Sequence, residues 1–537
     1  MKNLTLSSSL KHLAFAGTFV LASCGSTAPI LSTPIENIDQ TPTKFTELTE
    51  IEKKGWSHFD LKKDTIPGVS LNLAYEQLVK PNSKTVVVAV IDSGIDITHE
   101  DLKNNIWINE DEIPNNGIDD DKNGYVDDVN GWNFLGEADN EQLEFVRLLA
   151  SKNTSHPRYN EAQEKYNKER KKYTELKQQY SSILEQINAA ERAILNYLKK
   201  ESFTKEDVYN INTKDQSLVR NVSIIKQSYG FGYDTIGGLK KDLNRDLKSF
   251  NERLDYNLNI DFDGRSFVND DPNDLNDRNY GNNNVMPKKG RSHGTHVSGI
   301  IAATRNNGIG INGAANNVKI MAIRNTPNGD EYDKDVALGV YYAVDNGAKV
   351  INMSFGKGFS NHSDWVRDAI AYAAKNNVLI VAAAGNDGNN SDQIENYPND
   401  QIGTGAEISD TFLRVGATTN DYSSSLVAGF SNYGKSSVDV FAPGTEIYST
   451  YPKNDYEFAQ GTSMASPLVA GVAALLFSQY PNLSAAQVKT ILMESGLPIQ
   501  KKVILGNGSS VEFNRLCKSG KLVNAYNALI MASKLSK

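Results

Sequence analysis

The stretch GTSMASP at residues 461–467 runs directly into an apolar segment, LVAGVAALLF, at residues 468–477. The apolar segment predicts a buried helix, and small residues on both sides of Ser463 leave its hydroxyl accessible at the start of that helix. The first turn of a helix carries unpaired backbone N–H groups, which favour a developing negative charge. The pattern therefore indicates either a serine nucleophile or a serine that only caps a buried helix.

Two upstream stretches favour the nucleophile. Residues 85–91 (TVVVAVI) form a continuous, largely β-branched run, typical of a strand buried on both faces, and Asp92 follows at its end. A carboxylate there lies at the edge of an open α/β sheet where ligands bind. Residues 292–303 (SHGTHVSGIIAA) predict a helix with His293 in its first turn and His296, expected to be a packing histidine, one turn further on.

The chain order Asp, His, Ser is one of the orders in which the catalytic triad of serine proteases occurs. Through VAVIDSGID, SHGTHVSG and GTSMASP the sequence resembles the subtilisin-like serine proteases, the subtilase family. In such a site His293 acts as the base for Ser463, and Asp92 orients the imidazole. Asn386, which follows the apolar run 378–384, is expected to face the oxyanion with its side-chain amide.

Segments between these motifs alternate in type. Strands are expected at 318–323, 350–354 and 378–384, and helices at 335–344 and 365–375. This alternation predicts an α/β fold with a doubly wound, mostly parallel sheet and helices on both faces, as the resemblance to subtilisin also implies. An inserted α-helical arm is expected in addition.

The resemblance also implies where a substrate lies. An extended peptide pairs its backbone with one edge strand, and a second segment lines the pocket for the residue before the cut. The edge is expected at Ser354, Phe355 and Gly356, and the pocket at Ala383, Ala384 and Gly385. Because backbone pairing does not read side chains, broad specificity is expected.

Composition limits the class of protein. The chain has 537 residues, 39% of them hydrophobic and 23% charged, with a net charge of −9. These values describe an acidic globular protein without the basic bias expected of a nucleic-acid partner. Only two cysteines are present, Cys24 and Cys517, and a structural disulfide is not expected.

The N-terminus predicts export. Lys2 and Lys11 precede the apolar run 13–22, which is too short to span a bilayer in the mature protein. The following LASCG resembles a bacterial lipobox, in which Cys24 is lipidated after cleavage; the alternative is an ordinary signal peptide. We therefore expect a lipoprotein signal peptide at 1–23, a tether at 24–54 that leaves little room for an inhibitory prodomain, and a lipid anchor in the cell envelope.

An insertion separates Asp92 from His293, which lie 201 positions apart, where compact subtilases have a few tens. The expected domains are 55–139 and 259–537 for the catalytic unit and 140–258 for the helical insertion. Within the first part, DDDKNGYVDD at 119–128 matches an EF-hand-type calcium loop, although Asn130 replaces the closing glutamate. The expected ligands are Asp119, Asp121, Asn123, Tyr125 and Asp127. The alternative is an acidic surface turn.

The helical insertion carries a heptad seam of apolar and aromatic residues. Its members are Tyr173, Leu176, Tyr180, Ile183, Ile187, Ala190, Ile194 and Tyr197. Residues 215–256, with glycine breaks at 230–232 and 237–238, can cover this seam in an antiparallel arm; the alternative is a dimeric coiled coil. The acidic stretch 261–277 predicts a solvated loop or a second cation site.

These patterns together predict an exported, membrane-anchored serine endopeptidase that acts on proteins or peptides and holds structural calcium. The alternative is a catalytically silent, lipid-anchored binding protein whose helical arm contacts a protein partner. Hydrolysis of a denatured protein discriminates between the two.

Overall fold

The structure is a computed structural model, which describes residues 32–536 except residues 45, 82 and 404. Its centre is a nine-stranded sheet of order β10-β13-β7-β6-β5-β4-β1-β3-β2. The strands are β1 (Val86–Asp92), β2 (Gly131–Asn133), β3 (Val318–Arg324), β4 (Val350–Met353), β5 (Leu379–Ala383), β6 (Phe412–Thr418), β7 (Val440–Pro443), β10 (Leu497–Pro498) and β13 (Lys521–Leu522). All neighbours pair in parallel except β10 and β13.

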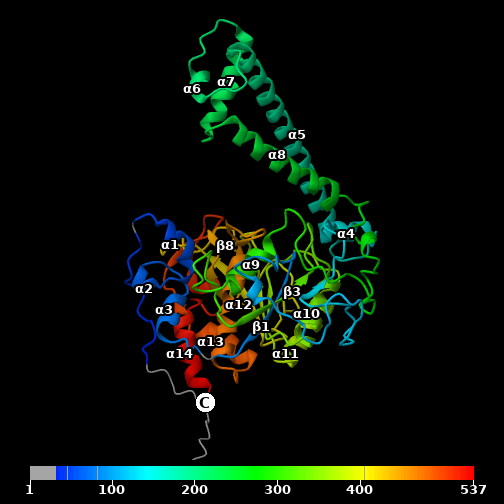
Figure 1. The fold of residues 1–537 in the computed structure, drawn as a ribbon, viewed down its shortest axis with the longest axis vertical. Coiled ribbons are helices and arrows are strands. Elements are labelled where there is room, and N and C mark those ends of the chain that lie inside the picture. The colour runs from blue at the N-terminus through cyan, green and yellow to red at the C-terminus, as the bar shows by residue number, and fades with distance from the viewer. Residues whose placement is uncertain (1–31, 45, 82, 404, 537) are drawn as a thin grey trace, which may run out of the picture.

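Helices cover both faces of this sheet, as predicted. Along β1, Val88 and Val90 point into one core and Ala89 and Ile91 into the other. The first core holds α3 (Leu71–Gln77), α9 (His293–Ala302), α12 (Thr462–Gln479), α13 (Ala485–Glu494) and α14 (Ala525–Leu535); the second holds α10 (Asp333–Asp345) and α11 (Ser363–Lys375). The doubly wound α/β fold is therefore confirmed (Figure 1).

Helix α12 runs through the first core. Within the described part of the chain it is the one helix long and apolar enough to cross a membrane, but 94% of it is buried inside the domain. Its composition therefore reflects its place in the core, where it packs against β4, β5, β6 and α9.

The described part of the predicted tether is attached to the domain. Ile38 is buried, and the backbone N–H of Ile35 donates to Oδ1 of Asn527 on α14 at 2.7 Å. The capped helix α1 (Glu50–Gly55) contacts β8 (Ile447–Tyr451). From residue 32 onward part of the predicted tether is thus packed on the domain, because Ile35 and Ile38 find apolar partners, whereas Ile51 is exposed. Cys24 and the predicted signal peptide lie outside the described residues.

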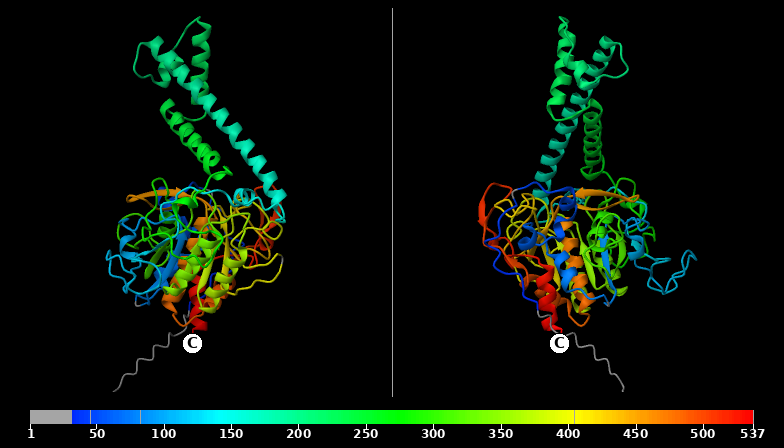
Figure 2. Two further views of the ribbon diagram at one scale, coloured as in Figure 1. Left: turned by 90° about the vertical axis from the view of Figure 1, so that its right-hand side faces the viewer. Right: turned by 60° about the vertical axis from the view of Figure 1, so that its left-hand side comes forward.

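The insertion forms an arm that projects from the domain (Figures 1 and 2). Its helices are α5 (Tyr159–Leu198), α6 (Lys205–Tyr209), α7 (Gln216–Gly230) and α8 (Ile236–Glu252), followed by a π-helical turn (Arg253–Asn257). Ile187 and Ile194 of α5 pack in one cluster with α7, while Tyr180 lies 5.1 Å from the Phe250 ring of α8. The heptad seam is thus covered by α7 and α8 of the same chain, as in the antiparallel arrangement.

Two boundaries of the arm differ from the expectation. Gly237 and Gly238 do not interrupt the helices, because they lie in the first turn of α8, which Thr235 caps. The short helix α4 (Glu144–Ala150), which the prediction placed in the arm, is buried against the catalytic domain, where Phe145 contacts Phe359. The arm therefore begins near the start of α5.

The acidic stretch after the arm is partly held in ion pairs. Arg265 binds Asp335 at 2.7 Å and also pairs with Asp270, whose side chain is fully buried. Lys334 lies 3.1 Å from Asp270 and 3.3 Å from Asp277. Guanidinium and ammonium groups thus already neutralise Asp270 and Asp277, whereas Asp261, Asp263, Asp271 and Asp274 are exposed, as expected of a solvated loop.

Candidate active site

Four polar residues predicted from the sequence lie at one edge of the sheet. Asp92 is the last residue of β1, His293 is the first residue of α9, Ser463 lies in the first turn of α12, and Asn386 follows the end of β5. The carboxyl ends of parallel strands meet at a common edge, which is where open α/β sheets bind ligands. The topology therefore brings these residues to one region of the molecule.

Asp92 and His293 form a close pair. Nδ1 of His293 lies 2.8 Å from Oδ1 and 3.0 Å from Oδ2 of Asp92, a carboxylate that is 1% exposed. The approach requires a glycine at position 294, since a Cβ there would lie 2.4 Å from the carbonyl oxygen of Gly94. Desolvation disfavours the imidazolium, but the negative charge of Asp92 and its hydrogen bond prevail and raise the pKa of His293 above 6.5.

Ser463 is half-buried between buried neighbours. Its hydroxyl donates to the carbonyl oxygen of Ser354 at 3.0 Å, and the hydroxyl of Ser354 donates to the carbonyl oxygen of Ser463 at 2.9 Å. Among the hydrogen bonds of the described residues none joins Ser463 to His293, so the expected serine–histidine contact is not formed in this conformation. A hydroxyl moves between partners by rotation about χ1.

Asn386 lies beside Thr462 and Ser463. Its Oδ1 accepts hydrogen bonds from the backbone N–H of Thr462 at 2.8 Å and from the Thr462 hydroxyl at 3.0 Å. A Cβ at Gly461 would lie 3.5 Å from both Nδ2 of Asn386 and the backbone nitrogen of Ser463. Nδ2 of Asn386 and the backbone nitrogen of Ser463 therefore both lie close to Gly461.

The predicted substrate segments lie next to these residues. Ser354, Phe355 and Gly356 continue from the end of β4, and Gly356 is exposed. On the other segment the Ala384 carbonyl accepts from Nδ2 of Asn432 at 3.0 Å, and the Gly385 N–H donates to the Thr462 hydroxyl at 3.1 Å. Hydrogen bonds within the protein thus hold the Ala383 to Gly385 segment in place, as the wall of a substrate pocket requires.

A buried charge cluster beneath the substrate edge was not predicted. Nζ of Lys357 lies 2.9 Å from Asp333, 3.1 Å from Glu144 and 2.7 Å from the carbonyl oxygen of Glu331. Arg147 pairs with Glu144 and donates to the same carbonyl. The cluster fastens α4, at the root of the arm, to the residue that follows Gly356. A single lysine next to a motif gives no sequence signal for such burial.

The acidic loop only partly matches the predicted calcium ligands. Oxygens of Glu112, Asp119 and Asp121 lie within 4.8 Å of one another. Both oxygens of Asp127 instead accept backbone N–H groups, from Asn116 at 3.0 Å and Gly117 at 2.9 Å. Oxygens of Glu112 and Asp119 also accept backbone N–H groups, so Asp127 differs from them only in lying outside the cluster of three. The EF-hand pattern did not include Glu112, which lies before the motif.

The two remaining predicted ligands have other contacts. Oδ1 of Asn123 accepts from the backbone N–H of Tyr125 at 2.8 Å, and the Tyr125 ring packs 4.9 Å from that of Tyr342. Within the described residues Glu112, Asp119 and Asp121 make no ion pair with a lysine or arginine. Three clustered carboxylates without a cationic side chain are a donor set that suits a hard cation such as Ca²⁺.

A parallel α/β sheet with Asp92, His293 and Ser463 at its carboxyl edge, in this chain order, defines the class of subtilisin-like serine peptidases. The sequence comparisons agree with this class. Residues 83–511 match the Subtilase family, and the chain belongs to this family.

Individual relatives match less than half of the chain. Thermitase of Thermoactinomyces vulgaris is 45% identical over 37% of this chain and 65% of its own length. Subtilisin DY of Bacillus licheniformis is 39% identical over 41% of this chain and 75% of its own length. A cell wall-associated protease of Bacillus subtilis (strain 168) is 41% identical over 40% of this chain, but only 22% of that protein is covered.

Proposed function

We propose that this protein is a serine endopeptidase that hydrolyses peptide bonds of proteins through Asp92, His293 and Ser463. The observation that carries the proposal is the contact of both Asp92 oxygens with Nδ1 of His293. A carboxylate there keeps the proton on Nδ1, so that Nε2 is available as a base. Membership of the Subtilase family supports the same chemistry.

The reaction begins when the Ser463 hydroxyl rotates from Ser354 toward Nε2 of His293. As Oγ bonds to the scissile carbonyl carbon, its proton passes to Nε2, and Asp92 stabilises the imidazolium. His293 then gives this proton to the leaving amine as the C–N bond breaks. Water attacks the acyl-enzyme with His293 again acting as base, which releases the acid and restores Ser463.

Negative charge on the substrate oxygen develops next to Ser463 as the serine attacks. The Nδ2 group of Asn386 and the backbone N–H of Ser463, which both lie close to Gly461, are the donors for that charge. Such preorganised donors stabilise the tetrahedral intermediate more than the ground state. The bonds from Thr462 to Oδ1 of Asn386 orient the amide for this role.

The substrate lies extended along Ser354 to Gly356, with the side chain before the cut against Ala383 to Gly385. Backbone pairing with an exposed edge selects for extended, unfolded segments rather than for particular side chains. Digestion of a peptide library by the full-length protein, analysed by mass spectrometry, tests the proposal. Cleavage that a serine-directed phosphonate blocks is expected. Binding of peptides without cleavage favours the catalytically silent binding protein.

We also propose that the protein is exported and lipid-anchored at Cys24. Support comes from the order of segments in residues 2–25, where basic residues precede an apolar run that ends in LASCG. The likeness to a protease described as cell wall-associated also supports export. Metabolic labelling with palmitate tests this. We expect label in the parent and none in Cys24→Ala, and an unlabelled parent contradicts the anchor.

A structural calcium ion is proposed at Glu112, Asp119 and Asp121. Their oxygens converge, and their charges repel one another unless a cation lies between them. The loop joins β1 to β2, so an ion there stabilises one side of the catalytic domain and takes no part in bond cleavage.

The helical arm is proposed to contact protein partners or substrates.

A further inference from the structure

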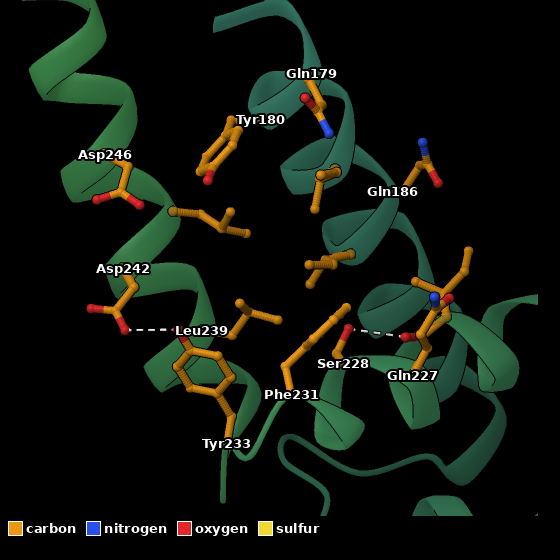
Figure 3. A pocket seen from close by; sticks show the side chains of 14 residues that line it. Gln179, Tyr180, Gln186, Gln227, Ser228, Phe231, Tyr233, Leu239, Asp242 and Asp246 are labelled. Atoms are coloured by element: carbon orange, nitrogen blue, oxygen red, sulfur yellow. Dashed lines mark hydrogen bonds between the residues drawn. The ribbon is translucent and has the colours of Figure 1, made fainter. Parts of the chain in front are cut away.

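The outer part of the arm contains a pocket between α5, α7 and α8, with a volume of about 530 Å³ (Figure 3). Its apolar wall comes from all three helices: Ile183 and Ile187 of α5, Ile224 of α7, and Leu239 and Leu243 of α8. Ile187, Leu239 and Leu243 also belong to the packed core of the arm. The pocket is therefore part of a folded unit with a core of its own.

Phe231 lies at this pocket between α7 and α8. Its side chain lines the pocket and is 71% exposed, although the arm has a packed core nearby. An exposed aromatic ring beside an apolar wall offers a partner a surface whose burial is favourable, by about 25 cal/mol for each Å² of apolar area.

The polar part of the lining is acidic. Asp242 and Asp246, one turn apart on α8, are the charged residues that line the pocket, and no lysine or arginine joins them there. Asp242 accepts from the Tyr233 hydroxyl at 2.9 Å, which holds its carboxylate in place (Figure 3). Arg245 pairs with Asp242 at 2.8 Å and with Asp246 at 3.4 Å, but its side chain is 69% exposed, so solvent screens both pairs.

This lining fits one class of ligand. Apolar side chains fill the hydrophobic wall, and a neighbouring lysine or arginine meets Asp242 and Asp246. A second copy of the chain fits poorly, because a symmetric contact places the same acidic residues opposite each other in a protein of net charge −9. An anionic lipid surface is repelled by the same two carboxylates.

The root of the arm borders the substrate edge. Arg158, just before α5, donates from Nη1 to the carbonyl oxygen of Gly358 at 2.8 Å. Ser354 is hydrogen-bonded to Ser463. The proposed substrate edge therefore runs from the proposed nucleophile past Gly356 toward Gly358. The part of a substrate that precedes the scissile bond pairs with this edge and leaves it beside the arm.

The spacing between the two sites follows from helix geometry. The pocket residues of α5 begin about 20 residues after Tyr159, which corresponds to about 30 Å along a helix. An extended chain covers about 3.3 Å per residue. About nine residues therefore span the distance from Gly358 to the pocket, and the four positions from Ser354 to Gly358 bring the count from the scissile bond to about twelve or thirteen.

We propose that this pocket is an exosite that binds an apolar, lysine- or arginine-containing segment of an unfolded substrate, about twelve or thirteen residues before the scissile bond. This inference rests on the proposed endopeptidase function. Because the exosite holds the substrate without touching the reacting bond, it lowers KM and leaves kcat unchanged.

Three peptides that share one cleavage sequence test the proposal. They differ only in a segment centred twelve residues before the cleaved bond, which is alternating Leu and Lys in the first peptide, alternating Leu and Glu in the second, and Gly and Ser in the third. The full-length parent is expected to cleave the Leu/Lys peptide with a KM about tenfold lower than that of the Gly/Ser peptide, at equal kcat. Phe231→Ala with Asp246→Lys should abolish this difference, and Asp246→Lys alone should shift the preference toward Leu/Glu.

Control variants change the same arm outside the pocket. Glu164→Lys makes the same charge change on an exposed residue of α5, and Val219→Ala shortens an exposed apolar residue of α7. Both should keep the parent preference. Equal KM values for the three peptides in the parent, or a preference that survives the double variant, overturn the exosite.

A binding measurement separates this inference from the function on which it rests. Fluorescence anisotropy of the labelled Leu/Lys segment with Ser463→Ala needs no catalysis, and the pocket variants should weaken binding about tenfold. If the segment binds but the parent cleaves no peptide, the exosite is supported and the endopeptidase function is contradicted. If the parent cleaves peptides but the pocket variants bind the segment as well as the parent does, the endopeptidase function is supported and the exosite is contradicted. Dimers that Phe231→Ala dissociates, or binding to anionic vesicles that it removes, identify another occupant and overturn the proposal.

Discussion

Ser463 and Ser354 are joined by two reciprocal hydrogen bonds, each from a hydroxyl to the partner's carbonyl oxygen, at 3.0 and 2.9 Å. The pair connects the first turn of α12 to the residue that follows β4. The proposed nucleophile is therefore held at the start of the proposed substrate edge. In this conformation its hydroxyl donates to a backbone carbonyl oxygen, and the proposed mechanism requires it to rotate toward His293.

Activity should fall in acid as His293 gains a proton. Asp92 raises the pKa of His293 above 6.5, and only the neutral imidazole accepts the serine proton, so kcat/KM should rise with pH through a pKa above 6.5. Asp92→Asn removes the charge that raises this pKa, so the acid limb should move to lower pH. Because the wrong tautomer is then favoured, kcat should also fall by about 10⁴. Peptide hydrolysis between pH 5 and 9 measures both effects, and an unshifted acid limb contradicts the assignment.

Asn386→Ala should lower kcat by about 10² to 10³ and change KM little, because the amide acts on the oxyanion and not on the bound peptide. The same variant loses two hydrogen bonds to Thr462, so its melting temperature must be measured beside its kinetics. Asn432→Ala, which removes a bond to the Ala384 carbonyl, serves as a structural control. A loss confined to KM argues against an oxyanion role.

Removal of calcium should lower the melting temperature of the parent, since Glu112, Asp119 and Asp121 then repel one another. Scanning calorimetry with and without EGTA measures the change. Asp119→Asn with Asp121→Asn should be insensitive to EGTA, whereas Asp261→Asn, an exposed acidic residue after the arm, should respond like the parent. An EGTA-insensitive parent shows that the acidic loop holds no stabilising ion.

Glu141 predicts a pH-dependent stability. Burial raises the pKa of this carboxyl to about 7, although Arg147 and Arg265 partly oppose the shift. The folded protein then binds this proton more tightly than the unfolded chain, so stability falls as pH rises from about 4.5 to about 7, by at most about 3 kcal/mol. Glu141→Gln should remove this loss and be more stable than the parent at pH 8. Urea unfolding at pH 5 and pH 8 measures it, with the exposed Glu164→Gln as control; equal pH dependence in parent and Glu141→Gln contradicts the prediction.

The core fold and the residues of the catalytic edge could be predicted because each depends on a short, continuous pattern. Asp92 ends a run of apolar residues, His293 begins a helix, and Ser463 lies between small residues ahead of an apolar helix. Each pattern specifies a local structure, and the parallel topology then places the carboxyl ends of the strands together. The heptad seam of α5 predicted a helical arm for the same reason.

What could not be predicted depends on contacts that no short sequence pattern specifies. Glu112 joins Asp119 and Asp121 from outside the recognised motif, while Asp127 accepts backbone N–H groups of its own turn. Lys357 is buried because Asp333 and Glu144, far away in sequence, contact its ammonium group. The packing of Ile35 and Ile38 on the domain likewise depends on residues far away in sequence.

The central claim is that Ser463 is the nucleophile of an endopeptidase. The most direct test combines a fluorescent phosphonate, which labels activated serines, with hydrolysis of a short peptide by the parent and by Ser463→Ala. We predict one label, on the peptide that contains Ser463, and loss of hydrolysis in a variant whose melting temperature is unchanged. Undiminished hydrolysis by Ser463→Ala, or phosphonate on another serine, would contradict the account.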